Sequence, residues 1–515
     1  MIKRKMYSSI GELICSSAIR FEKRNAYIFN VSGALCEKTY NDFKTDIFKF
    51  VGALDDIKYQ KIALIGSSSY EWLVAYFGII IAGKVVIPIE KDLDHTTIRE
   101  RLKQVDSRCI VCDYDFKRNF QPVSSQYIEI YGFDFFDNKD STYTVKLDET
   151  KRGVNEICCI VFSSGTSGGV KAVSLSEKNI ITDVCNLAVT IEIDDNSRVL
   201  SVLPFTHMLE LSTSIMCAIY LGATVFINGS LRDLRENIKY FQPAIIVVVP
   251  AYVNMFYKDI VSKYNSKFKK WILCKKQKLF KLANLLNLDI GNIIFKDIYK
   301  LFGGNLKILV CGGAELDKSK IAFFQDIGIT ILQGYGMTEC APVISTNTIK
   351  FNKLGSVGRP LPCSVVKIKN GEIFVRGDNV MLGYYNDTKS TNEVLKDGWL
   401  STGDLGFLDK DGYLYITGRK KNIIILENGE NVSAEEIEKR LKSACEQIID
   451  VIVFAENNYI NAEIYYGENN PQVEASIIHT VNSFTYDWPR YKKIQRIVFR
   501  YEPFDYTALS KLKRM

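Results

Sequence analysis

The sequence predicts an α/β protein with a large N-terminal domain of mixed and parallel sheets, a β-rich subdomain and a small, mobile α+β domain at the C-terminus. From residue 62 onward, short apolar runs alternate with helix-like segments, a pattern typical of buried parallel sheet. After residue 355 the pattern changes to hairpins and then to a short α+β region. A chain of 515 residues also exceeds what one compact core usually holds.

The large domain is predicted from strands that are apolar along their whole length. The apolar run at residues 72–83 is too short to span a bilayer and ends at Lys84, so we expect a buried helix there. The predicted strands are residues 62–65, 85–87, 109–112, 157–162, 245–249, 308–310 and 330–332.

Turn signals define the β-rich subdomain and the C-terminal domain. Asn370-Gly371 and Asp411-Gly412 each separate two strand-like segments and predict hairpins. Ser433 begins a capping box that opens a helix. Strands near 451–454, 462–465 and 497–501, with a helix near 473–484, complete the small domain. We therefore expect a large domain over residues 1–419, its β-rich part over about 350–417, and a lid domain over 420–515.

The charge pattern disfavours nucleic acid as a partner. Lysine and arginine number 66 against 59 acidic residues, an excess of seven that is thinly spread. Lysines cluster between Lys263 and Lys281 with Phe268, Trp271 and Phe280 among them, and helix-like spacing predicts a solvated basic face. At most we expect peripheral attraction to an anionic membrane surface or to a phosphorylated thiol cofactor.

The cysteines and the N-terminus favour a cytoplasmic protein. The chain has 13 cysteines, mostly within apolar stretches, as suits a reducing compartment. Cys109 and Cys112 form a single CxxC inside a predicted strand, so core packing is expected rather than zinc binding. Residues 1–25 are basic but contain no apolar segment of a secretory signal.

A glycine-rich loop follows the predicted strand 157–162. Glycines let backbone amides approach an anion, hydroxyls add donors and lysine adds positive charge, which is the chemistry of polyphosphate binding. The residues concerned are Ser163, Ser164, Gly165, Thr166, Ser167, Gly168, Gly169 and Lys171.

Two other functional motifs fit this loop poorly. A Walker loop needs glycine before the lysine and serine or threonine after it, but Val170 and Ala172 stand there. A hydrolase nucleophile elbow would use Ser167 and must run straight into a helix, whereas residues 173–176 alternate like another strand. A flexible surface hairpin remains the structural alternative for the loop considered alone.

The loop resembles the phosphate loop of the adenylate-forming, or AMP-binding, superfamily, which includes acyl-CoA synthetases, adenylation domains and firefly luciferase. Val170 replaces the usual proline and Ala172 the usual glycine. The segment Gly312-Gly313-Ala314-Glu315 resembles the family's adenine-contacting motif. The segment Gly334-Tyr335-Gly336-Met337-Thr338-Glu339 resembles its most diagnostic motif; by this resemblance Tyr335 stacks on adenine, Thr338 binds the α-phosphate and Glu339 holds Mg²⁺.

The resemblance continues to the C-terminus. Residues 398–404 resemble the ribose-binding motif, with Asp404 as the acceptor, and Arg419 would also reach the ribose. Lys421 stands at the family's hinge position. Near the end, Lys511 matches the lysine that enters the active site, although Ser510 replaces the usual glycine.

Residues 203–211 resemble the long-chain version of the acyl-pocket motif, with His207 lining the pocket near the carboxylate. Met208 stands where relatives specific for amino acids carry aspartate, which disfavours an amino-acid substrate. The resemblance implies an acyl-CoA synthetase-like fold and ATP- and Mg²⁺-dependent activation of a medium- or long-chain fatty acid to acyl-AMP. Transfer to a thiol follows, on coenzyme A or on the phosphopantetheine arm of an acyl carrier protein.

The resemblance implies that the catalytic residues are Lys511, Thr338, Glu339 and His207.

Other functions stay open at this point. A luciferase-like oxygenase would share every motif, and a non-catalytic nucleotide sensor would result if Ser510 and the short tail disabled Lys511. We expect the ligase, because the motifs occur in the family's order along residues 10–515.

Overall fold

The computed structural model describes residues 5–31, 33–120, 128–135, 152–164, 169–191, 196–285, 290–426, 431–456, 459–467 and 469–505. The chain divides into two compact units. The larger comprises residues 1–366 and 375–400, and the smaller comprises residues 367–374 and 401–515. Within the described ranges, we find no helix with the length and hydropathy needed to cross a membrane.

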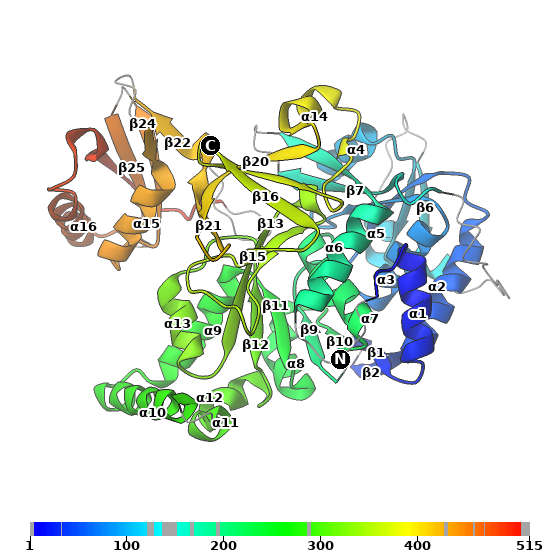
Figure 1. Ribbon diagram of the computed structural model, residues 1–515, viewed down its shortest axis with the longest axis horizontal. Helices are drawn as coiled ribbons and strands as arrows, with labels where there is room; N and C mark the ends of the chain where they lie inside the picture. The colour runs from blue at the N-terminus through cyan, green and yellow to red at the C-terminus, as the bar shows by residue number, and fades with distance from the viewer. Residues whose placement is uncertain are drawn as a thin grey trace. The chain divides into compact units, whose positions relative to one another are not determined.

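A nine-stranded sheet forms the centre of the larger unit, in the order β15-β14-β13-β12-β11-β9-β10-β1-β2 (Figure 1). Its six central strands are parallel, and β2, β14 and β15 are joined antiparallel at the edges. The strands are β1 Asn25–Val31, β2 Ala34–Thr39, β9 Arg198–Ser201, β10 Thr224–Ile227, β11 Ile245–Val248, β12 Ile308–Cys311, β13 Thr330–Gly336, β14 Val343–Thr346 and β15 Arg359–Pro360.

A second sheet of the larger unit has seven strands, in the order β18-β8-β7-β4-β3-β5-β6. Strands β3 to β7 are parallel, while β8 and β18 continue the sheet antiparallel. The strands are β3 Lys61–Ile65, β4 Val85–Ile89, β5 Cys109–Cys112, β6 Glu129–Gly132, β7 Ile157–Ser164, β8 Val170–Ser176 and β18 Gly383–Tyr384.

Some of the helices pack between these two sheets. Helix α6 packs on β7 and β8, and the π-helix η3 packs on α6 and on β9 and β11. Figure 1 shows α6 and α7 between the two sheets. The helices are α1 Ile10–Arg20, α2 Tyr40–Leu54, α3 Tyr70–Ile81, α4 His95–Gln104, α5 Tyr114–Asn119, α6 Glu177–Thr190, η3 Glu210–Met216, α7 Cys217–Leu221, α8 Leu234–Phe241, α9 Pro250–Lys263, α10 Lys267–Leu285, α11 Gly291–Ile294, α12 Lys296–Tyr299, α13 Lys318–Gln325 and α14 Thr388–Val394.

The α/β fold class is confirmed, and the predicted strands of the large domain are all present. Helix α3 is buried along its length, as the apolar run predicted. Cys109 and Cys112 are buried free thiols of β5, in agreement with core packing. Because β8 is a strand antiparallel to β7, the loop between them does not lead into a helix, and the nucleophile elbow is excluded.

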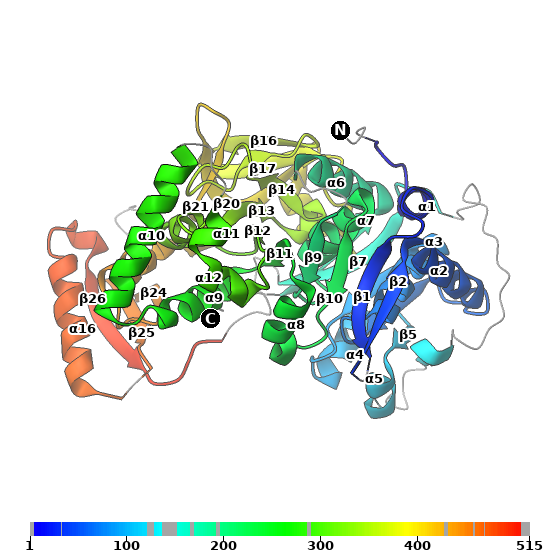
Figure 2. The same cartoon turned by 90° about the horizontal axis from the view of Figure 1, so that it is seen from below.

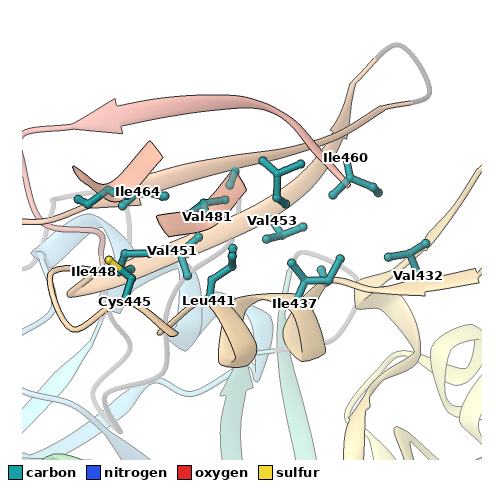
Figure 3. Close-up of a cluster of buried hydrophobic side chains, with 14 of the residues drawn as sticks. Val432, Ile437, Leu441, Cys445, Ile448, Val451, Val453, Ile460, Ile464 and Val481 are labelled. Atoms are coloured by element: carbon teal, nitrogen blue, oxygen red, sulfur yellow. The ribbon is translucent and has the colours of Figure 1, made fainter. Parts of the chain in front are cut away.

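The smaller unit contains the predicted α+β domain. Its three-stranded sheet has the order β24-β25-β26, and Ser433 caps α15 through the amide of Glu436. The helices and sheet enclose one apolar core that includes Ile437, Leu441 and Val453 (Figure 3). The elements are β22 Ile423–Ile425, β23 Asn431–Ser433, α15 Ala434–Ala444, β24 Asp450–Glu456, β25 Tyr459–Tyr465, α16 Pro471–Phe484 and β26 Ile494–Arg500.

Both hairpins lie where the turn signals predicted them. They join β16 Ser364–Lys369 to β17 Glu372–Gly377 and β20 Trp399–Leu408 to β21 Leu414–Arg419. Asn370 and Gly371 adopt φ values of 52° and 77°, as a tight turn of this kind requires. Strands β16, β17 and β20 contribute residues to both units. The predicted domain boundary between residues 419 and 420 lies inside the smaller unit, because that unit contains residues 401–515.

Candidate active site

Three segments of the larger unit meet at the carboxyl ends of β12 and β13. These strands are parallel neighbours, so segment 312–315, which follows β12, lies beside segment 334–339, which begins in the last residues of β13. A Cβ added to Gly312 would lie 4.0 Å from the carbonyl oxygen of Gly334 and 3.4 Å from the side chain of Leu209. The predicted adenine, phosphate and acyl-pocket segments are therefore neighbours, at the edge where open α/β sheets bind ligands.

The turn after β13 is closely packed. A Cβ at Gly336 would lie 2.0 Å from the carbonyl oxygen of Pro342, so only glycine fits there. Tyr335 and Thr338 are partly buried, and Glu339 is buried within the short 3₁₀ turn η6, Thr338–Cys340. The carbonyl of Glu339 accepts a hydrogen bond from the amide of Met381 at 2.8 Å. This hydrogen bond holds the backbone of Glu339 in place.

Two hydroxyl groups from other elements meet the Glu339 carboxylate. Ser163 Oγ, at the end of β7, lies 3.5 Å from Glu339 Oε1, and the Tyr384 hydroxyl lies 3.1 Å from the same oxygen. Burial, and then the charge of Glu339, raise the pKa of Tyr384, so this hydroxyl stays protonated and donates. The arrangement presents one carboxylate with oriented donors where the predicted phosphate-binding segments converge.

Tyr384 is a residue that the sequence analysis missed. It reaches Glu339 because β18 pairs with β8 in antiparallel register, with Tyr384 opposite Val173. A two-residue strand gives no periodic signal. The aromatic pair Tyr384-Tyr385 after a glycine was the only available hint, and it carries no chemistry by itself.

Lys171 lies on β8, on the side of Tyr384. Its Nζ donates to Asp387 Oδ2 at 2.9 Å and to Ser390 Oγ at 2.7 Å, and it lies 5.7 Å from the centroid of the Tyr384 ring. The hydrogen bond from Lys171 is the main cause that lowers the pKa of Asp387 to about 2. A phosphate approaching Lys171 would therefore compete with the Asp387 carboxylate for this ammonium group.

His207 lies in a tight turn just before the π-helix η3. Its amide donates to Pro204 O at 3.1 Å, and within the described part of the chain its buried Nε2 has no hydrogen-bond partner. Burial lowers the pKa of His207 below 6.5, and the charge of Glu90 opposes this only partly. The imidazole is therefore neutral at pH 7 and has one ring nitrogen ready for a polar partner.

Glu210, the first residue of η3, is a second functional candidate that the sequence analysis missed. Its side chain is fully buried, and burial raises its pKa to about 8, although the hydroxyls of Ser201 and Ser214 lower it in part. Ser212 Oγ donates to Ala341 O at 3.1 Å and so links η3 to the Glu339 turn. A glutamate followed by three hydroxyl residues in an apolar run was the signal that could have found this site.

The predicted ribose-binding residues lie in the smaller unit. Asp404 on β20 is opposite Arg419 on β21, and Arg419 Nε lies 2.9 Å from the buried carboxylate of Asp404. The amide of Arg419 donates to Glu435 Oε2 at 2.9 Å. Lys421 is exposed in the turn that follows. Asp404 and Arg419 are thus adjacent, and the backbone of Arg419 is held by Glu435 of α15.

The remaining predicted residues are placed only in part. Gly313 and Ala314 are partly buried and Glu315 is exposed. Ser164 is described as the last residue of β7. The predicted residues Gly165, Thr166, Ser167, Gly168 and Lys511 lie outside the described residues.

Comparison with known proteins defines the class. The sequence model of the family of AMP-binding enzymes matches residues 16–385. The long-chain-fatty-acid–CoA ligase FadD15 of Mycobacterium bovis is 26% identical over 428 residues, which cover 75% of this chain and 69% of that protein. Long-chain-fatty-acid–CoA ligase 1 of Cavia porcellus is 32% identical over 329 residues, covering 59% of this chain and 47% of that protein.

A solved structure extends the likeness to the whole fold. The anthranilate CoA ligase AuaEII, solved in complex with anthranoyl-AMP, superposes with a TM-score of 0.79 and is 18% identical, over 99% of this chain and 96% of that one. The fold is therefore that of the acyl-CoA synthetase-like enzymes. The chain belongs to the family of AMP-binding enzymes.

Proposed function

We propose that this chain activates a carboxylic acid with ATP and transfers the acyl group to a thiol. The observation that supports it best is the buried Glu339 carboxylate, with the Ser163 and Tyr384 hydroxyls on one oxygen, where the phosphate segments of an AMP-binding enzyme meet. Within the expected range of medium- or long-chain fatty acids, the names of its relatives support a long-chain acid as the substrate and coenzyme A as the acceptor. An acyl carrier protein is the alternative acceptor.

In the first step, a carboxylate oxygen of the acid attacks the α-phosphorus of ATP. A bond forms between this oxygen and phosphorus, and the bond from phosphorus to the bridging oxygen of pyrophosphate breaks. The product is an acyl-adenylate, in which AMP is a good leaving group. Thr338 would bind the α-phosphate, and the loop Ser163–Lys171 would hold the leaving pyrophosphate with amides and hydroxyls.

The donor set fits a magnesium ion that arrives with the nucleotide. Among the described residues no group of three or more histidine, cysteine or acidic side chains converges on one point. Magnesium commonly takes one or two protein carboxylates with substrate phosphates, and Glu339 supplies one such carboxylate. When bound, the ion would neutralise negative charge on the phosphates.

In the second step, a thiol sulfur attacks the acyl carbonyl. The carbon–sulfur bond forms, the bond from carbon to the AMP oxygen breaks, and the thiol proton passes to solvent. His207 is neutral and has a free ring nitrogen beside the acyl segment, so we assign to it orientation of the acid rather than charge pairing. Asp404 and Arg419 would bind the ribose, and Tyr335 with Gly313 and Ala314 would bind the adenine. Lys511 would bridge the carboxylate and the α-phosphate in the first step only.

The location and the partners complete the proposal. All 13 cysteines are free thiols, which supports a reducing cytoplasm. Contact with a membrane would be peripheral, and a long-chain acid is itself enriched in bilayers.

The test is a panel of acids of graded chain length with ATP, Mg²⁺ and either coenzyme A or holo acyl carrier protein. We expect thioester, AMP and pyrophosphate in equal amounts, with coenzyme A as the better acceptor. ATP that binds tightly without turnover would instead favour a nucleotide sensor. Light emission or oxygen consumption from the adenylate would favour the oxygenase.

A further inference from the structure

Helix α10 has two apolar faces, of which the protein covers only one. Figure 2 shows α10 along the surface of the larger unit, beside α9 and α12. Leu273, Phe280 and Ala283 are buried against the unit. The helix carries seven lysines and no acidic residue, so its remaining surface is strongly basic.

The second apolar face is exposed. Phe268, Trp271, Leu279 and Leu282 are 69%, 57%, 54% and 57% exposed. At 100° per residue they fall within an arc of roughly 80°, so they form one stripe along the helix. The arc also contains the exposed Lys275, whose Nζ lies 5.4 Å from the centroid of the Trp271 ring. The rings of Phe268 and Trp271 stack with centroids 6.1 Å apart. Four large apolar side chains in one exposed stripe exceed what a solvated basic face needs.

Lysines lie on both sides of this stripe. Lys270, Lys278 and Lys281 are exposed on one side, where Lys281 also pairs with Asp326 at 2.9 Å. On the other side a groove of about 430 Å³ is lined by Lys263, Tyr264, Lys269, Ile272, Lys276 and Asp297. Asp297 accepts a hydrogen bond from Lys276 at 2.8 Å. The other two lysines of the groove, Lys263 and Lys269, give the groove a net positive charge. Ile272 lines the groove and lies beside the apolar stripe on the helix, so the groove and the stripe adjoin.

We propose that α10 binds the surface of a bilayer that contains anionic phospholipid. The stripe would enter the boundary between head groups and acyl chains, and the flanking lysines and the groove would contact lipid phosphates. A second copy of this chain is a poor partner because the two lysine-rich helices would repel each other. Nucleic acid is a poor partner because the two leucines of the exposed apolar stripe offer it no polar or charged contact. This proposal rests on the peripheral membrane contact proposed above and assigns that contact to α10. Its test does not require catalysis.

The experiment is flotation of the purified full-length chain with vesicles of phosphatidylcholine alone, or with 30% phosphatidylglycerol. The variant Lys270→Glu/Trp271→Ser changes an exposed lysine and its exposed aromatic neighbour. Its matched control is Lys239→Glu/Tyr240→Ser on α8, because Lys239 is exposed, Tyr240 is 61% exposed and the charge change is the same.

We expect the wild type and the control to bind the anionic vesicles at least tenfold more tightly than phosphatidylcholine vesicles, and 0.5 M NaCl to weaken this binding. The affinity of the Lys270→Glu/Trp271→Ser variant for the anionic vesicles should fall at least tenfold, because one lysine near an anionic surface is worth roughly fivefold in affinity. Leu282→Ser alone should weaken binding severalfold without any change of charge. Circular dichroism melts of all variants should match the wild type, since the changed side chains are exposed.

Equal binding to both vesicle types, or equal binding by the variant and its control, would overturn the proposal. So would a dimer that the α10 variant abolishes while vesicle binding is absent. Loss of thioester synthesis in any of these proteins bears on the proposed function alone, because flotation is measured without ATP or acid.

Discussion

At the scale of single residues, the hydroxyl of Tyr384 carries the most specific prediction. Tyr384→Phe removes the donor that lies 3.1 Å from Glu339 Oε1 and leaves the ring in place. A hydrogen bond to a charged group is worth about 1.5–3 kcal/mol, so we expect adenylate formation to fall by roughly tenfold to a hundredfold. Pyrophosphate exchange as a function of ATP concentration measures this.

The adjacent residue provides a matched control. The Tyr385 hydroxyl accepts from Lys61 at 2.8 Å. Tyr385→Phe removes the same atom one residue along the chain and should change exchange less than threefold. If both variants behaved alike, orientation of Glu339 by Tyr384 would be ruled out.

The π-helix η3 carries the prediction at the scale of an element. Glu210 is fully buried at its start, with its pKa raised to about 8 from an ordinary value near 4.5. Because the folded pKa is the higher one, the unfolded chain ionises first, and stability is lost between about pH 4.5 and pH 8 as the pH rises. The ionisation penalty of this buried acid is therefore absent at low pH and reaches up to a few kcal/mol at pH 8.

Glu210→Gln keeps the shape and removes the titration. Its free energy of unfolding should exceed that of the wild type by an amount that grows from pH 5 to pH 8. Urea denaturation at several pH values measures this, with Glu236→Gln on the exposed surface of α8 as the control. A difference that did not vary with pH would contradict the neutral buried state.

The elements also show what the sequence could predict. Strand β12 is apolar throughout and β3 is apolar after Lys61, because helices or sheets cover both faces. Such apolar runs can be recognised in the sequence without knowledge of the contacts. The site around Glu339 was found only in part for the opposite reason. Tyr384 and Asp387 reach Glu339 and Lys171 through the pairing of β18 with β8, which no local pattern encodes. The π-helix was missed because its spacing differs from the 3.6-residue period.

The exposed face of α10 gives a similar lesson. Residue spacing predicted a solvated basic helix, and α10 is basic and largely exposed. Spacing alone could not decide which of its two apolar faces the protein covers. Burial of Leu273 and Phe280 settles this and leaves Trp271 outside.

At the scale of the whole molecule, the two half-reactions should separate. The family resemblance implies that Lys511 serves adenylate formation and that the small domain rotates about Lys421 before thioester formation. Lys511→Ala should therefore abolish formation of acyl-AMP and leave thioester formation from added acyl-AMP largely intact. Single-turnover assays of each half-reaction measure this, and equal loss of both would contradict the division of roles.

The whole account depends on one pocket in which an organic acid displaces pyrophosphate from ATP. Exchange of labelled pyrophosphate into ATP, with Mg²⁺ and fatty acids of graded chain length, tests this step without any thiol. We predict acid-dependent exchange that Glu339→Gln reduces at least a hundredfold. Absence of exchange by the folded wild-type protein with every acid would contradict the account.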